Sequence, residues 1–176
     1  MDGRVTASRP PLERDIWELL SHVPDPEIPV LDVVALGIIR YVHVEQDSAG
    51  LQVRSIQVGV SPTYTGCPAT EVIHAAIRDK LAAAGHANVQ VDTVLFPPWS
   101  SAWLTDEARA RLAEYGIAPP ARALSRRRQG CAAPAVRCPR CASIQTQCVS
   151  EFGSTPCKAS YRCLACREPF EYFKCI

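Results

Sequence analysis

The sequence predicts an α+β protein in which a small domain with the element order αββαβα precedes a compact cysteine-rich module. Helical and strand periodicities alternate between residues 12 and 116, with glycine and proline between them, and this alternation predicts the first domain. All but one of the nine cysteines lie beyond residue 130, which predicts the second. We therefore expect a domain over residues 1–116, a linker over 117–136 and a module over 137–176.

The first three elements follow from the spacing of apolar residues. Residues 12–23 repeat apolar side chains at helical spacing, and the prolines of "PDPEIP" at 24–29 end this helix. Residues 37–44 and 51–60 are rich in β-branched side chains and predict a hairpin. The apolar positions of the second strand shift phase along it, which predicts a β-bulge near Ser55.

The remaining elements of the first domain are another helix, a strand and a last helix. The second helix follows the loop that contains Cys67 and ends at Gly85, and residues 88–96 read as a third strand. After a proline-containing connector, Thr105 is a suitable N-cap for a helix that ends at Gly116. These helices and strands complete the predicted αββαβα order.

Charge differs between the segments. Residues 1–116 carry 9 basic and 15 acidic side chains, a net −6, whereas residues 117–136 carry +4 and residues 137–176 carry +3. The middle segment is rich in Pro, Ala and Arg and predicts a solvated linker. No apolar run approaches the roughly 20 residues of a membrane span, and no secretory segment is recognisable. Reduced cysteines and a cytoplasmic protein are therefore expected.

Two C-x-x-C knuckles, "CPRC" and "CLAC", are the most specific motif of the chain. Four thiolates at this spacing suit a tetrahedral Zn²⁺, with the intervening residues forming a β-hairpin, so a zinc ribbon is predicted. About forty residues bury little core, and the metal would therefore supply much of the stability. The expected ligands are Cys138, Cys141, Cys163 and Cys166.

Two further interpretations of the module remain. Because Cys148, Cys157 and Cys175 offer additional thiolates, an iron-sulfur cluster or an iron-loaded ribbon is the alternative to zinc. Four thiolates around a divalent ion carry a net charge of −2, which reduces the +3 of the module to about +1. A nucleic-acid partner is therefore not favoured.

The isolated Cys67 lies in "VSPTYTGCPATEVI", where Pro68 is suited to the first position of a helix. Cys67 is then the predicted N-cap, and the helix dipole favours its thiolate, which is typical of reactive or metal-binding cysteines. His74 lies two turns further along, about 10 Å along the axis, which is too far for a catalytic pair. We interpret His74 as a surface residue.

An acidic turn lies upstream, in "PDPEIPVLDV", where prolines stiffen the chain around Asp25, Glu27 and Asp32. By itself such a turn would only end the preceding helix. Together with the cysteine loop it becomes a candidate polar pocket, formed by Asp25, Glu27, Asp32, Thr63, Thr65 and Cys67.

The same residues carry a resemblance to known families. "DPEIPVLDVVALGII" and "VSPTYTGCPATEVI" resemble the iron-sulfur assembly domain shared by SufT-type proteins and the targeting factors of cytosolic iron-sulfur assembly. "FPPWSSAWLTDEARARLAEYGIAPP", followed by "CPRC", "FGSTPCKASYRC" and "CREPFEYFK", resembles the PaaD family, the D subunits of the ring-1,2-phenylacetyl-CoA epoxidase system. The resemblance covers residues 12–176.

The resemblance implies an accessory protein rather than an enzyme, one that assists maturation or repair of the iron-sulfur or iron centre of the multicomponent epoxidase in bacterial phenylacetate degradation. The implied partners are the epoxidase subunits, including the iron-sulfur reductase. The implied cofactors are zinc in the ribbon and iron or a labile iron-sulfur cluster in the assembly domain. The implied pocket residues are Asp25, Glu27, Thr63, Thr65 and Cys67, the implied ribbon ligands are the four knuckle cysteines, and Cys157 is a further candidate ligand.

Several alternatives stay open at this point. One thiolate per chain cannot hold a cluster that needs four ligands, so a homodimer, the client or other thiols of the ribbon would have to contribute. A non-catalytic adaptor that docks epoxidase components through the ribbon is the second hypothesis, with Cys67 as a structural thiol. The sequence does not select the metal, the client subunit, or which of Thr63 and Thr65 lines the pocket.

Overall fold

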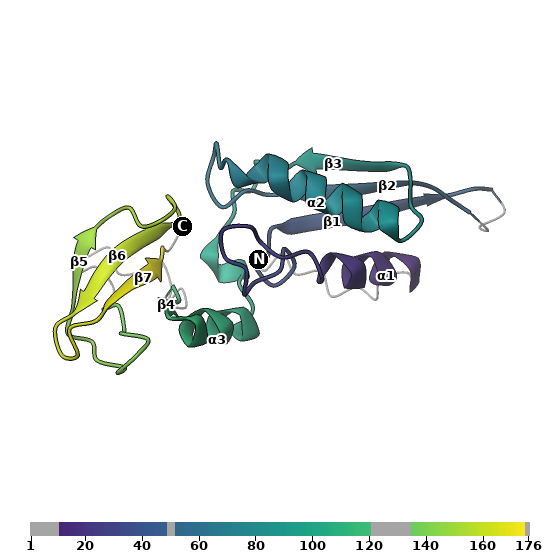
Figure 1. The fold of residues 1–176 in the computed structure, drawn as a ribbon. Helices are drawn as coiled ribbons and strands as arrows, with labels where there is room; N and C mark the ends of the chain where they lie inside the picture. The colour runs from purple at the N-terminus through teal and green to yellow at the C-terminus, as the bar shows by residue number, and fades with distance from the viewer. Residues whose placement is uncertain (1–10, 49–51, 121–134, 175–176) are drawn as a thin grey trace.

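The computed structural model describes residues 11–48, 52–120 and 135–174 (Figure 1). The first domain contains α1 (Pro11–Leu20), β1 (Ile39–Gln46), β2 (Val53–Val60), α2 (Ala69–Ala83), β3 (Val89–Thr93) and α3 (Asp106–Tyr115), which is the predicted order. A short 3₁₀ turn, η1 (Ser101–Trp103), precedes α3. The second domain contains β4 (Ile117–Ala118), β5 (Thr146–Ser150), β6 (Lys158–Cys163) and β7 (Pro169–Phe173).

The first domain is built on a three-stranded sheet of order β1-β2-β3 (Figure 1). β1 and β2 form the predicted antiparallel hairpin, and β3 returns parallel to β2 after α2. α1 and α2 contact each other and the sheet, so their apolar faces close one core. Leu20, Ile56, Val58, Ile77 and Leu81 are completely buried there.

The predicted bulge is present in β2. Glu45 pairs with Ser55 and Gln46 pairs with Val53, so Arg54 has no partner residue on β1. This extra residue shifts the alternation of side chains by one position, and Ile56 and Val58 consequently face the core. The phase shift in the sequence therefore predicted a real irregularity of the ladder.

Helix boundaries agree with the sequence except at two ends. α1 ends at Leu20, three residues before the predicted end, and the chain continues as a turn in which the Val23 N–H donates to the Leu20 carbonyl at 3.0 Å. The N-cap of α2 is Pro68 and not Cys67. Pro68 already has helical dihedral angles, so Cys67 lies one residue outside the helix and its carbonyl accepts from the Thr70 N–H at 3.2 Å.

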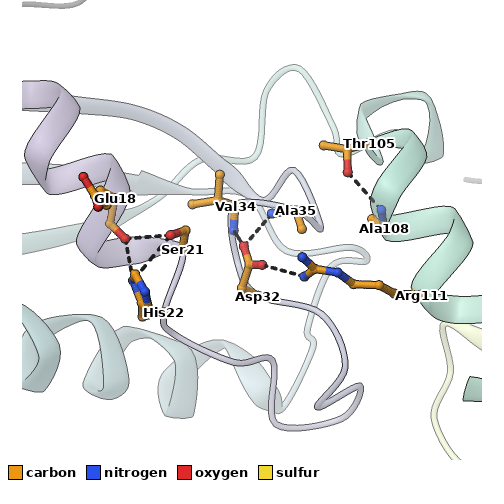
Figure 2. Close-up of polar contacts among 9 residues, drawn as sticks. All are labelled: Glu18, Ser21, His22, Asp32, Val34, Ala35, Thr105, Ala108 and Arg111. Atoms are coloured by element: carbon orange, nitrogen blue, oxygen red, sulfur yellow. Dashed lines mark hydrogen bonds and ion pairs between the residues drawn. The ribbon is translucent and has the colours of Figure 1, made fainter.

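α3 begins and ends as predicted. The Thr105 hydroxyl accepts a hydrogen bond from the Ala108 N–H at 3.0 Å, which satisfies one of the free donors of the first turn (Figure 2). Gly116 closes the helix in the left-handed conformation, with φ of 94°.

The C-terminal domain is a four-stranded sheet of order β4-β7-β6-β5. β5, β6 and β7 are antiparallel neighbours, which includes the predicted hairpin, and β4 adds to β7 in parallel. Because β4 directly follows α3, the first residues of the predicted linker already belong to this sheet. Residues 121–134, with the arginine run and Cys131, and residue Cys175 lie outside the described residues.

The two domains share apolar packing. Phe173, at the end of β7, is completely buried and belongs to the core of the first domain. Its ring meets Trp99 edge to face at a centroid distance of 5.8 Å, and Trp99 Nε1 donates to the Leu36 carbonyl at 3.1 Å. The C-terminal domain is therefore packed against the first domain. Within the described ranges, no helix has the length and apolarity to cross a membrane.

Candidate functional site

Four cysteine sulfurs gather at one end of the C-terminal sheet. The Sγ atoms of Cys138, Cys141, Cys163 and Cys166 all lie within 4.8 Å of one another. Cys138 and Cys166 are 3.8 Å apart, and Cys141 and Cys163 are 3.5 Å apart. A tetrahedral Zn²⁺ with Zn–S bonds of about 2.3 Å separates its sulfurs by ~3.8 Å. The four residues therefore fit one zinc ion.

The two knuckles have matching backbone geometry. In each, the N–H of the first cysteine donates to the carbonyl five residues later, from Cys138 to Ser143 and from Cys163 to Glu168, at 2.9 and 3.0 Å. In each, the residue after the second cysteine has a positive φ, 59° at Ala142 and 65° at Arg167. Two similar turns thus present two sulfurs each to one point.

The pKa values of two ribbon thiols are shifted in opposite directions. The Cys166 N–H, followed by other local donors, lowers the pKa of the Cys163 thiol to about 6. The Glu168 N–H lowers the pKa of Cys166, but burial and the sulfurs of Cys163, Cys141 and Cys138 outweigh it and raise the pKa to about 12. Several thiolates cannot coexist at this spacing without a positive ion, which is the requirement of a metal site.

A second candidate site is a cavity that lies between the domains. Its volume is about 20 Å³, which is sufficient for one water-sized occupant. It is lined by apolar side chains of the core, among them Ile28, Leu36, Ile73 and Phe173. Its polar lining consists of Asp25, Glu27, Thr63, Cys67, Thr70 and Cys157.

The acidic turn contributes two carboxylates to this cavity. Asp25 is only 6% exposed, and its Oδ1 accepts from the N–H groups of Glu27 and Ile28 at 2.9 and 2.8 Å. Burial raises the pKa of Asp25 despite these bonds. Burial, and then the charge of Asp25, also raise the pKa of Glu27. Both carboxylates are therefore costly to ionise unless a cation is near.

Cys157 approaches the same carboxylates from the ribbon. Its Sγ lies 3.9 Å from Glu27 Oε2 and 3.0 Å from Thr155 Oγ1, and the residue is 3% exposed. Burial raises the pKa of the Cys157 thiol, which the Thr155 hydroxyl partly opposes. The next residue, Lys158, is buried and forms an ion pair of 3.0 Å with Glu171. Its charge favours ionisation of Asp25, Glu27 and Cys157.

The Tyr64 hydroxyl is buried beside Cys67. Burial raises its pKa to about 12, with further contributions from the neighbouring Cys67, Glu27 and Cys157.

The predicted pocket residues do not all meet. Asp25, Glu27, Thr63 and Cys67 line the cavity, whereas Thr65 is exposed and does not. Asp32 does not line it either. Its Oδ1 accepts from the N–H groups of Val34 and Ala35, and its Oδ2 pairs with Arg111 of α3 at 3.4 Å (Figure 2). Asp32 therefore fixes a turn and a helix rather than the pocket.

His74 is not the surface residue that the sequence suggested. It is 6% exposed, its Nε2 has no hydrogen-bond partner among the described residues, and burial lowers its pKa. The interpretation was wrong because the buried face of α2 is wider than its apolar positions alone indicate, and it includes His74. His74 is still not among the residues that line the cavity.

For three residues near the cavity, the sequence analysis predicted either no role or a different role. Thr70 follows Cys67 by three positions, which places both beside the start of α2, and this spacing could have indicated it. Cys157 was grouped with the ribbon, and only the packing of the domains places it in the cavity. Nothing in the sequence indicates that Lys158 lies near the cavity, because its position also depends on the packing of the two domains.

The fold and the two sites define the class of protein as an iron-sulfur assembly domain joined to a zinc ribbon. Residues 13–93 match the family profile described as an iron-sulfur cluster assembly protein, and residues 123–174 match the PaaD zinc beta ribbon domain. A protein of Escherichia coli (strain K12), named as the D subunit of a "Putative 1,2-phenylacetyl-CoA epoxidase", is 51% identical over 98% of this chain and 99% of its own length. The chain belongs to the PaaD family, the family of epoxidase D subunits.

Two further relatives match the first domain. An "Fe-S protein maturation auxiliary factor" of Porphyromonas gingivalis is 34% identical over 57% of this chain and 90% of its own length. The crystal structure of a domain of unknown function, DUF59, from Bacillus anthracis has a TM-score of 0.51 at 24% identity and covers 57% of this chain and 90% of that one. The second similarity supports the α+β fold of the domain.

Proposed function

We propose that the chain is an accessory protein that assists maturation or repair of the iron-sulfur or iron centre of the multicomponent phenylacetyl-CoA epoxidase in bacterial phenylacetate degradation. Its partners are then the epoxidase subunits, including the iron-sulfur reductase, and its compartment is the cytoplasm. The match to an iron-sulfur assembly family and the names of the two curated relatives support this role.

One observation carries the proposal. Cys67 lines a narrow cavity together with the buried carboxyl of Asp25 and the half-buried carboxyl of Glu27, in the domain that matches the assembly family. A thiolate and carboxylates together suit iron, because thiolates are soft ligands and carboxylates are hard ones. The types of donor atom therefore suit iron as cargo of the pocket, and the exposed Thr65 and Gly66 just before Cys67 are suited to contact with a client.

The cavity is less suited to catalysis of its own. Among the described residues that line it there is no histidine, and its carboxylates have raised pKa values because they are buried. The thiol–carboxylate contact in it, from Cys157 Sγ to Glu27 Oε2 at 3.9 Å, joins two groups whose pKa values are both raised by burial, so the thiol is not activated as a nucleophile. An accessory role, with the chemistry performed by the client, is therefore preferred over an enzyme.

Reconstitution of the epoxidase tests this function. The epoxidase subunits would be produced with the wild-type chain, the Cys67→Ser variant or the matched control Cys148→Ser, whose thiol is exposed on β5 outside both sites. We expect Cys67→Ser to reduce the iron and sulfide content and the activity of the epoxidase, with ribbon zinc unchanged. Full activation by Cys67→Ser, equal to that of the control, would contradict the proposal.

A non-catalytic adaptor is the second candidate, and exposed apolar side chains of the ribbon favour it. Ile144, Val149, Phe152 and Leu164 are each at least half exposed on this small domain. Such side chains are common in contact surfaces. Replacing Val149 and Phe152 by serine should abolish co-purification with epoxidase subunits if the chain is an adaptor, while Cys67→Ser should leave it unchanged.

A further inference from the structure

Cys157 belongs to the ribbon in sequence but to the assembly domain in space. It directly precedes β6, is buried in the core of the first domain, and lines the cavity that contains Cys67. Cys163, at the other end of β6, contributes to the four-sulfur site. Five residues of extended strand lie between the two cysteines, and the six residue steps span ~20 Å. Cys157 therefore cannot serve the zinc of the ribbon.

We propose that Cys157 is the second sulfur ligand of the assembly pocket, and that the pocket takes a single divalent cation of the Fe²⁺ class between Cys67, Cys157 and Glu27. The inference rests on the proposed function and makes it more specific. The assembly domain supplies one sulfur and the carboxylate, and the ribbon supplies the other sulfur within the same chain.

The donor atoms support this choice of occupant. Glu27 Oε2 and Cys157 Sγ are 3.9 Å apart, close to the separation of two ligands around one metal ion. Two thiolates select soft or borderline metals, and a carboxylate beside them suits iron or zinc better than copper(I). The site thus differs from the all-sulfur site of the ribbon.

The size of the cavity supports a single ion rather than an assembled cluster. Its volume of about 20 Å³ accommodates one water-sized body. A [2Fe-2S] core contains four heavy atoms and would require the domains to move apart. A single cation also needs fewer sulfur ligands than a cluster does. Because one chain supplies two sulfurs, a second protein chain is then not required as a source of ligands.

The charges around the cavity also favour a cation. Asp25, Glu27 and Cys157 are all partly or fully buried, and the nearby cation, Lys158, already pairs with Glu171. A divalent ion would compensate the negative charges that form when the two thiols release their protons to solvent on binding.

Anaerobic titration of the full-length, zinc-loaded chain with Fe²⁺ tests the proposal. We expect one iron per chain in addition to the ribbon zinc, with no acid-labile sulfide. Cys157→Ser should weaken iron binding by at least ~10–100-fold, since even an outer-shell partner of a metal typically has an effect of this size. Cys148→Ser, the matched control, should bind as the wild type does.

A second, spectroscopic measurement keeps Cys157 intact. Its result can therefore be interpreted even if the Cys157→Ser variant disturbs the fold of the ribbon. Co²⁺ binds more weakly than Zn²⁺ to such sites and should occupy the pocket without displacing ribbon zinc. Cys67→Ser at saturating Co²⁺ should retain sulfur-to-cobalt charge-transfer absorption from the remaining thiolate. Its complete loss in this variant would overturn the role of Cys157.

The outcomes separate the two proposals. If Cys67→Ser abolishes iron binding and Cys157→Ser has no effect, the role of Cys157 is wrong while the proposed function stands. If the wild-type chain binds neither iron nor Co²⁺ beyond its zinc site, the proposed metal-handling function itself fails. More than one iron per chain with stoichiometric sulfide would overturn the single-ion site and leave cluster handling in place.

Discussion

Replacing Phe173 by alanine should destabilise a domain to which this residue does not belong in sequence. Phe173 ends β7 of the ribbon, yet it is 0% exposed and packs edge to face on Trp99 of the first domain. Burial of a phenylalanine contributes ~1.5–3 kcal/mol and an aromatic pair ~0.5–1.5 kcal/mol more. With the cavity left behind, we expect Phe173→Ala to reduce the free energy of unfolding by ~3–5 kcal/mol.

The assay follows from the positions of the tryptophans. All three, Trp17, Trp99 and Trp103, lie in the first domain, so urea unfolding monitored by tryptophan fluorescence reports on that domain. Bound zinc reports independently on the ribbon. Phe173→Ala should lower the fluorescence midpoint while one zinc per chain remains bound, because Phe173 pairs with Lys158 at the start of β6 whereas Cys163, a zinc ligand, ends that strand.

Phe152→Ala is the matched control. Phe152 is also a ribbon phenylalanine but is 65% exposed, and its replacement should change the free energy of unfolding by no more than ~0.5 kcal/mol. If Phe173→Ala and Phe152→Ala have the same fluorescence midpoint, the ribbon does not contribute to the core of the first domain. The placement of Cys157 in the pocket would then lose its support.

Two other predictions concern the metal and the acidic turn. Chelation of the ribbon zinc should lower the unfolding midpoint of the first domain as well, because Cys157 and Phe173 then lose their scaffold; an unchanged fluorescence midpoint at zero zinc would contradict this. Burial raises the pKa of Asp25 above its ordinary 3.8, so its contribution to stability is fully present below about pH 3.8 and is lost as pH rises through the folded-state pKa. Relative to the wild type, Asp25→Asn should therefore gain stability as the pH rises above about 3.8, measured by unfolding at a series of pH values. A stability difference that does not change with pH would refute the buried charge.

The packing of the ribbon changes the meaning of its zinc site. A ribbon attached only by a linker would be an independent module, and its metal would stabilise only itself. Here β4 follows α3 without a break, and Phe173 and Cys157 enter the first domain. The zinc therefore stabilises the strand that presents Cys157, and the ribbon is part of the wall of the proposed iron pocket.

Much of the fold and both metal-related motifs follow from the sequence alone. Apolar periodicity is a local property, so it predicted the αββαβα order, and even the bulge at Arg54 is visible as a shift of phase. The C-x-x-C knuckles are equally local, because each brings two sulfurs together within one turn. Thr105 and Gly116 marked the ends of α3 for the same reason.

Only the tertiary structure decided which side chains share the pocket. Asp25 and Asp32 occupy similar places in the same turn, yet one is buried in the cavity and the other pairs with Arg111 on α3. His74 is buried by contacts that its own helix does not reveal. Cys157 lies 90 residues after Cys67 in sequence and meets the same cavity because Phe173 fixes the ribbon on the first domain. Local patterns carry no information on such contacts, which depend on how two complete domains pack.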